Sequence, residues 1–145
     1  MIWKLNGDFL AIRLDPGDDL LECVGEAVNS SGIGSGFITS CVGALKKARF
    51  TSILSTPEGF KYAPMREVEG AVELLLASGN IEPKEAGGTK VHIHAMLCID
   101  DHEFTGGHLD DHGNIIGVTA EILVAKFPGI IRETPKGPSA PIKFN

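Results

Sequence analysis

The sequence has little of what marks a disulfide-stapled, membrane-spanning or nucleic-acid-wrapping protein. Its three cysteines, Cys23, Cys41 and Cys98, are an odd number at wide spacing, and no leader-like apolar start precedes them, so a reducing, cytoplasmic location is expected. Every apolar run is far shorter than the ~18 residues that a membrane helix needs. The 13 basic residues are outnumbered by 19 acidic ones, which excludes a surface that is basic all round.

A chain of 145 residues with 43% hydrophobic side chains can form one core, which predicts a single domain over residues 1–145. Segments rich in β-branched and aromatic residues predict five or six strands, at Phe9–Leu14, Phe37–Leu45, Ala48–Leu54, Val68–Ala77, Val91–Ile99 and Val118–Phe127. Because only one helical pattern occurs among them, the repeated βαβ unit of a parallel sheet is excluded. We expect an α+β fold, with a mainly antiparallel sheet covered by one helix.

The helical pattern follows the first predicted strand. Asp15 and Pro16 are typical of an N-cap and of the first helical position. The apolar residues beyond them recur at helical spacing and predict one face that covers the sheet: Leu20, Leu21, Val24, Ala27 and Val28. Gly32 then predicts the end of the helix.

The last part of the chain differs in composition from the rest. Residues 128–145 hold four of the eight prolines, which predicts a meandering tail that packs on the body or on a neighbour. Residues 126–145 carry four basic side chains against Glu133 alone. Since these charges are sparse, a solubilising end is favoured over a nucleic-acid-binding arm.

Four of the five histidines fall in or beside two segments that predict a hairpin. His92 and His94 are two residues apart on a predicted strand, so both point to the face opposite to its apolar residues. A fold-back centred on Asp101 pairs position 94 with position 108, and directly opposed residues have Cβ atoms ~4.5–5.5 Å apart. His108 then lies beside His94. The Gly106–Gly107 pair allows the second strand to bulge or another backbone to approach closely.

Three neutral imidazoles predict a site for one divalent metal, most simply zinc, with a fourth position open to water or substrate. The alternative is that His92 and His94 are exposed or hydrogen-bonded strand residues without a metal. Cys98 shares their face but lies ~13 Å along the strand from His94, which excludes it as a ligand. His102 and His112 are expected to be solvated loop residues, although either could carry protons near pH ~6.5.

Two further groups are candidates for function. Glu121 interrupts an otherwise apolar predicted strand. It could accept a hydrogen bond from a ligating imidazole, act as a general base, or be a surface charge on an edge strand. Lys46, Lys47 and Arg49 could contact phosphate, but a strand edge guarded by charge is the favoured interpretation. The glycine-rich residues 32–36 follow the helix and lead into a strand, so they are not a dinucleotide-binding loop.

Several short motifs, in their order and spacing, resemble the plants-and-prokaryotes-conserved (PPC) domain family over nearly the whole chain. The matching segments are Ile12–Leu20, Val42–Leu45, Glu73–Asn80, His92–His94, Gly106–Leu109 and Val118–Ile122. The resemblance implies an α+β fold assembled as a homotrimer. It also implies a histidine metal site like that of some prokaryotic members, with its ligands at His92, His94 and His108.

The resemblance further implies the family's usual description as a predicted DNA-binding protein, which in plant members depends largely on an AT-hook. This chain has no Arg-Gly-Arg hook, and its segment Gly70–Leu75 lacks the arginine of the corresponding plant segment. The net charge of -6 disfavours direct binding to DNA. Two functions stay open: a trimeric, metal-containing regulatory or DNA-associated module, and a metal-dependent enzyme that acts on a small molecule at the histidines.

Overall fold

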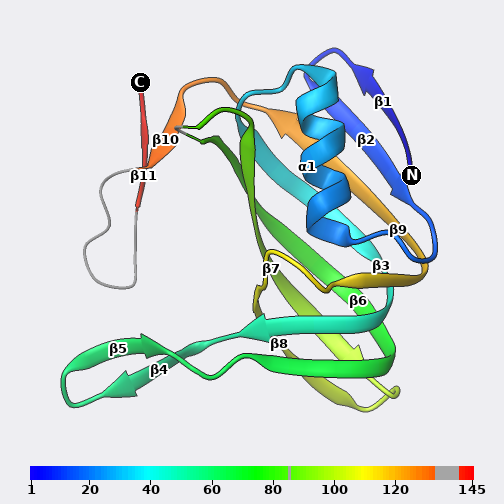
Figure 1. The fold of residues 1–145 in the computed structure, drawn as a ribbon, viewed down its shortest axis with the longest axis vertical. Helices are drawn as coiled ribbons and strands as arrows, with labels where there is room; N and C mark the ends of the chain where they lie inside the picture. Colours follow the sequence, from blue (N-terminus) through cyan, green and yellow to red (C-terminus); the bar gives the residue numbers. More distant parts are fainter. Residues whose placement is uncertain (85, 133–140) are drawn as a thin grey trace.

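The computed structural model describes residues 1–84, 86–132 and 141–145. Seven strands form its main sheet: β1 (Ile2–Asn6), β2 (Phe9–Leu14), β3 (Gly36–Thr51), β6 (Arg66–Pro83), β7 (Thr89–Ile99), β8 (Glu103–Leu109) and β9 (Ile115–Lys126). All neighbours pair antiparallel, in the order β1-β2-β9-β3-β6-β7-β8. One helix, α1 (Leu20–Ser31), lies across one face of this sheet (Figure 1). The predicted α+β class, with an antiparallel sheet and one covering helix, is confirmed.

The two faces of the sheet follow from alternation in the sequence. In β2 the side chains of Leu10, Ile12 and Leu14 are buried and the residues between them are exposed. The helix meets this apolar face with the five residues predicted from its spacing, all of them buried. The core therefore lies between α1 and one side of the sheet.

The helix begins later than the sequence predicts. Asp19, not Asp15, is the N-cap, and its side chain accepts hydrogen bonds from two backbone N–H groups of the first turn, at 3.1 and 3.4 Å. Asp15 instead accepts a hydrogen bond from the N-terminal ammonium group at 3.0 Å, because a turn at Gly17, with φ of 94°, separates it from the helix. The end of the helix is as predicted, with Gly32 in the left-handed conformation.

Two strands predicted separately are one long strand. β3 runs unbroken over the first segment and over the second as far as Thr51, and its register against β6 and β9 shifts between Leu45 and Lys47. Such a bulge bends a strand and resets its alternation of buried and exposed residues. That reset explains why the sequence pattern looks like two strands.

The end of β3 closes part of the sheet on itself. Phe50 pairs with Leu109 and Thr51 pairs with His108, so β3 contacts β8 as well as β6 and β9. Because β6, β7 and β8 are joined in turn, these strands and β3 form a closed ring at the lower end of the molecule (Figure 1). His108 lies where the ring closes.

The sequence did not predict β1, nor the two separate short strands that follow β3. β4 (Ile53–Thr56) and β5 (Gly59–Tyr62) form a separate two-stranded sheet, which projects from the ring as an arm (Figure 1). The turn between them falls at Pro57, where a turn is expected. Phe60 on this arm is 68% exposed.

The described parts of the tail lie against the body. β10 (Ile130–Arg132) pairs with β11 (Ile142–Phe144) and contacts β6. The side chain of Ile130 is buried, and the rings of Phe127 and Phe144 meet edge to face at 5.6 Å. The middle of the predicted tail, residues 133–140, lies outside the described residues. Within the described ranges no helix has the length and apolar character needed to cross a bilayer.

We predict that Asp19→Ala lowers the free energy of unfolding by about 1–2 kcal/mol, because the helix loses its N-cap acceptor. The same carboxylate also accepts a hydrogen bond from the backbone N–H of Gly113 at 2.6 Å. Urea denaturation of the two variants Asp19→Ala and Asp15→Ala measures the difference. A larger loss for Asp15→Ala than for Asp19→Ala would contradict the assignment of the cap.

Candidate metal centre

Three histidines from β7 and β8 converge on one point. His94 is paired directly with His108, as the fold-back about Asp101 predicts. The Nε2 atom of His92 lies 3.1 Å from Nε2 of His94 and 3.0 Å from Nδ1 of His108. One ring nitrogen from each residue falls within 4.8 Å of the other two. The structure therefore brings together all three predicted ligands.

The turn between β7 and β8 sets this register. Asp100 and Asp101 have φ values of 48° and 66°, in the left-handed region that tight hairpin turns use, and Ile99 pairs with Glu103 across them. The backbone N–H of His102 donates to the carbonyl oxygen of Ile99 at 3.2 Å and closes the turn. Because the side-chain period of a strand is two, a slip of one residue would turn His108 to the other face.

The two glycines before His108 allow β8 to fit between two other strands. A Cβ atom on Gly106 would lie 2.1 Å from the carbonyl oxygen of Ala95 on β7. A Cβ atom on Gly107 would lie 2.1 Å from the carbonyl oxygen of Thr51 on β3. The predicted close approach of another backbone is confirmed on both sides, and the β7–β8 register has no bulge.

The two nitrogen–nitrogen distances that involve His92 are compatible with a tetrahedral ion. Ligands at about 2.0–2.1 Å from such an ion are separated from one another by roughly 3.3 Å, close to the two short distances seen between the rings. All three donors are imidazole nitrogens, which suit a divalent transition metal and not calcium or magnesium. Burial, and then the neighbouring His94, lower the pKa of His108, so its neutral, ligating form is favoured.

A hollow of about 420 Å³ opens beside His108. Its walls include Thr51, Tyr62, Met65, Lys90, His108 and Asp111. The ring centroid of Tyr62, at the end of β5, lies 6.0 Å from that of His108. Sequence analysis missed this wall because the arm was not predicted, although an aromatic residue at every second position after the Pro57 turn indicates a strand.

Glu121 does not contact the histidines of its own chain. It is exposed on β9, and the strand order places β3 and β6 between β9 and β7. It lines a different groove, of about 400 Å³, together with Trp3 and Arg13. Glu121 therefore serves the three histidines of its own chain neither as a base nor as a hydrogen-bond acceptor.

The other predicted residues lie outside the cluster. His102 is exposed in the hairpin turn, where hydrogen bonds to the Asp101 side chain and then to the backbone of Asp100 raise its pKa. His112 is exposed as well, with its Nδ1 atom 2.7 Å from a carboxylate oxygen of Glu22. Cys98 is buried and does not join the three histidines.

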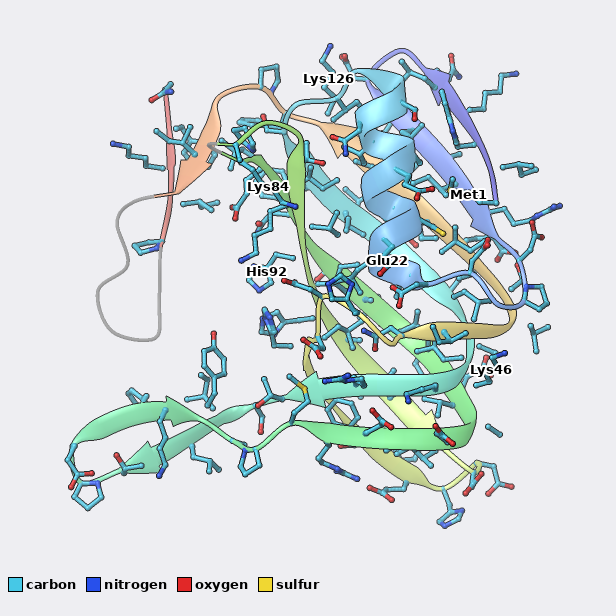
Figure 2. All side chains as sticks on the ribbon, viewed as in Figure 1. Met1, Glu22, Lys46, Lys84, His92 and Lys126 are labelled. Atoms are coloured by element: carbon cyan, nitrogen blue, oxygen red, sulfur yellow. The ribbon has the colours of Figure 1, made fainter. Side chains whose placement is uncertain are left out.

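The predicted basic patch is largely paired with acids. Lys47 lies 2.8 Å from Glu67 and 3.3 Å from Glu69, which raise its pKa in that order. Arg49 lies 2.8 Å from Asp110. Lys46 is exposed at the side of the molecule away from His92 (Figure 2). The patch therefore offers DNA less positive charge than its sequence indicates.

Comparisons with known proteins agree with the fold. The sequence-family model of the Plants and Prokaryotes Conserved (PCC) domain matches residues 4–128 of this chain. A plant- and prokaryote-conserved protein of Pyrococcus horikoshii is 27% identical, with a TM-score of 0.74 over 93% of this chain and 90% of that one. The metal-containing protein AF0104 of Archaeoglobus fulgidus is also 27% identical, with a TM-score of 0.68 over 87% of this chain and 84% of its own.

Two further similarities were found. A candidate DNA-binding protein of Bacteroides thetaiotaomicron has the same fold, with a TM-score of 0.81 at 20% identity, over 99% of this chain and 96% of that one. The bifunctional protein GlmU of Synechococcus sp. (strain JA-2-3B'a(2-13)) is 32% identical over 117 residues. That match covers 81% of this chain but only 16% of the GlmU protein.

We predict that Gly107→Ala displaces β8, because a methyl group there meets a backbone carbonyl oxygen that cannot move aside. The overpacking should lower the free energy of unfolding by about 1–3 kcal/mol and weaken zinc binding. Urea denaturation and calorimetric titration with zinc measure both effects. Gly34→Ala is the matched control, since Gly34 faces open space. Zinc affinity in Gly107→Ala equal to that of the unmodified protein would contradict the role of this glycine.

Proposed function

We propose that this chain, which belongs to the Plants and Prokaryotes Conserved (PCC) domain family, binds one divalent transition-metal ion, most simply zinc, through His92, His94 and His108. The observation that carries the proposal is the convergence of three imidazole nitrogens within 4.8 Å. The metal-containing relative in Archaeoglobus fulgidus, 27% identical, supports it.

The proposed ion keeps one coordination position for a small molecule. Three protein ligands and one open position are typical of catalytic zinc sites, whereas structural sites have four protein ligands. When bound, the ion would supply Lewis acidity to the group in its fourth position. The hollow beside His108 supports a metal-dependent reaction on a small molecule as the second candidate function.

A homotrimer is the proposed assembly. The sheet carries large apolar side chains on the face away from the helix, among them Leu76, Met96 and Val118, which are 56%, 51% and 64% exposed. Apolar side chains grouped on one face are typical of a surface that another chain covers. The arm, whose two strands are marginally stable alone, would gain contacts in such an assembly.

A role in DNA association is proposed only through partners of this protein. The fold is shared with candidate DNA-binding proteins, but at 20% identity. In this chain Lys47 and Arg49 are already paired with carboxylates, and the net charge is -6. A duplex would have to displace those acids before it gained contacts to its phosphates.

We predict up to about one zinc-like ion per chain in the purified protein and loss of that ion in His108→Ala, since a two-ligand site binds far more weakly. Elemental analysis measures the content, and His102→Ala, outside the cluster, is the matched control. The variant should remain folded by circular dichroism, because a core of this size does not depend on a metal. Equal metal content in His108→Ala and the unmodified protein would rule out the assignment.

We predict that light scattering at micromolar concentration gives a mass of about 46 kDa, three chains of 15.4 kDa. The expected cause is burial of the apolar sheet face between subunits. The measurement should be made on both zinc-loaded and metal-free protein. A stable monomer of 15.4 kDa in both would refute the trimer.

We predict weak binding, or none, between this protein and duplex DNA. Three chains of net charge -6 each carry -18 together, which repels a duplex at long range. Fluorescence anisotropy with a random-sequence duplex at low and at moderate salt measures the affinity. Submicromolar binding with a steep salt dependence would overturn this prediction and direct attention to Lys46, Lys47 and Arg49.

A further inference from the structure

We propose that the hollow beside His108 binds a small organic carboxylate. The metal and Lys90 would hold its charged end, and Tyr62 and Met65 would contact its apolar part. This inference rests on the proposed metal site and adds the chemical class of the molecule that meets the ion.

The charge of the site favours an anion. Three neutral imidazoles leave the full double positive charge on a divalent ion, because no carboxylate belongs to the cluster. The carboxylate of a bound molecule would supply the missing negative charge. Oxygen ligands of this kind are accepted by zinc at about 2.0–2.2 Å.

Lys90 adds a second positive charge at the same place. It lies two residues before His92 on β7, so the two side chains leave the same face of the strand. It lines the hollow together with His108. Among the described residues no hydrogen-bond or ion-pair partner of Lys90 is found, so its ammonium group is available to a ligand.

The acids near the hollow do not cancel these charges. Asp110 is paired with Arg49 at 2.8 Å and also accepts the backbone N–H of Asp111 at 3.0 Å. Asp111 is exposed at the rim, where it is shared with a second hollow below α1. Within the lining of this hollow, a divalent ion and Lys90 together outweigh the carboxylate of Asp111.

The opposite wall is apolar and is held in place by the backbone. Tyr62 and Met65 are 47% and 43% exposed, so a ligand that covers them would remove apolar surface from water. The Oγ1 atom of Thr51 donates to the carbonyl oxygen of Ala63 at 2.8 Å and fixes the base of the arm to β3. The volume of about 420 Å³ is within the range of about 300–1,000 Å³ that small-molecule sites occupy.

Tyr62 provides a direct readout, since it is the one tyrosine of the sequence. Protein labelled with 3-fluorotyrosine has a single ¹⁹F resonance at the wall of the hollow. Titration of the zinc-loaded protein with 3-phenylpropionate should shift this resonance with saturation, at lower concentration than acetate or inorganic phosphate. The neutral analogue 3-phenylpropanol should produce no shift over the same range.

Lys90→Gln should raise the Kd of 3-phenylpropionate about five- to tenfold, because one partly exposed charge-assisted contact is lost. Its zinc content should be unchanged. Lys126→Gln is the matched control, because Lys126 lies at the top of the molecule, away from His92 (Figure 2). That variant should bind the anion as the unmodified protein does.

The outcomes separate this inference from the proposed function. If zinc binds but 3-phenylpropionate does not shift the resonance, or if Lys90→Gln binds it with unchanged Kd, the carboxylate site is wrong and the metal site stands. Tighter binding of phosphate than of 3-phenylpropionate would overturn the assignment to carboxylates. If no zinc binds, as elemental analysis would show, both proposals are wrong.

Discussion

The pairing of His94 with His108 is the contact on which the candidate metal centre depends. A tight turn with left-handed Asp100 and Asp101 fixes it from one side, through the register of β7 and β8. The pairing of His108 with Thr51 fixes it from the other side, where β3 closes the ring. Since both strands alternate with period two, neither pairing can slip by one residue without removing His108 from the site.

The site lies on the face of β7 opposite to the core, which separates metal binding from folding. Ile93 and Leu97 are fully buried under the helix-covered face, while His94 is exposed on the other. The core is therefore complete without an ion. The same arrangement leaves His108 in the wall of the hollow that Tyr62 also lines.

The local parts of this account could be predicted from the sequence, and the non-local parts could not. The register about Asp101 follows from turn chemistry and strand period alone, and it places three histidines together. The start of the helix could not be predicted, because Asp15 and Asp19, on either side of a turn, are both suitable N-cap residues. The alternation of Phe60 and Tyr62 indicates a strand, but the place of that strand beside His108 depends on the pairing of β3 with β8, which no short-range pattern reveals. Lys90 is a candidate ligand-binding residue only because it lines the same hollow as Tyr62.

The most direct test is anomalous diffraction at the zinc edge from crystals of the zinc-loaded protein. One anomalous peak is expected between His92, His94 and His108, at about 2.0–2.1 Å from a ring nitrogen of each, with a fourth ligand that is not a side chain of the same subunit. A peak elsewhere, or an ion that Cys98 or a carboxylate of the same chain completes to four ligands, would contradict the open three-histidine site.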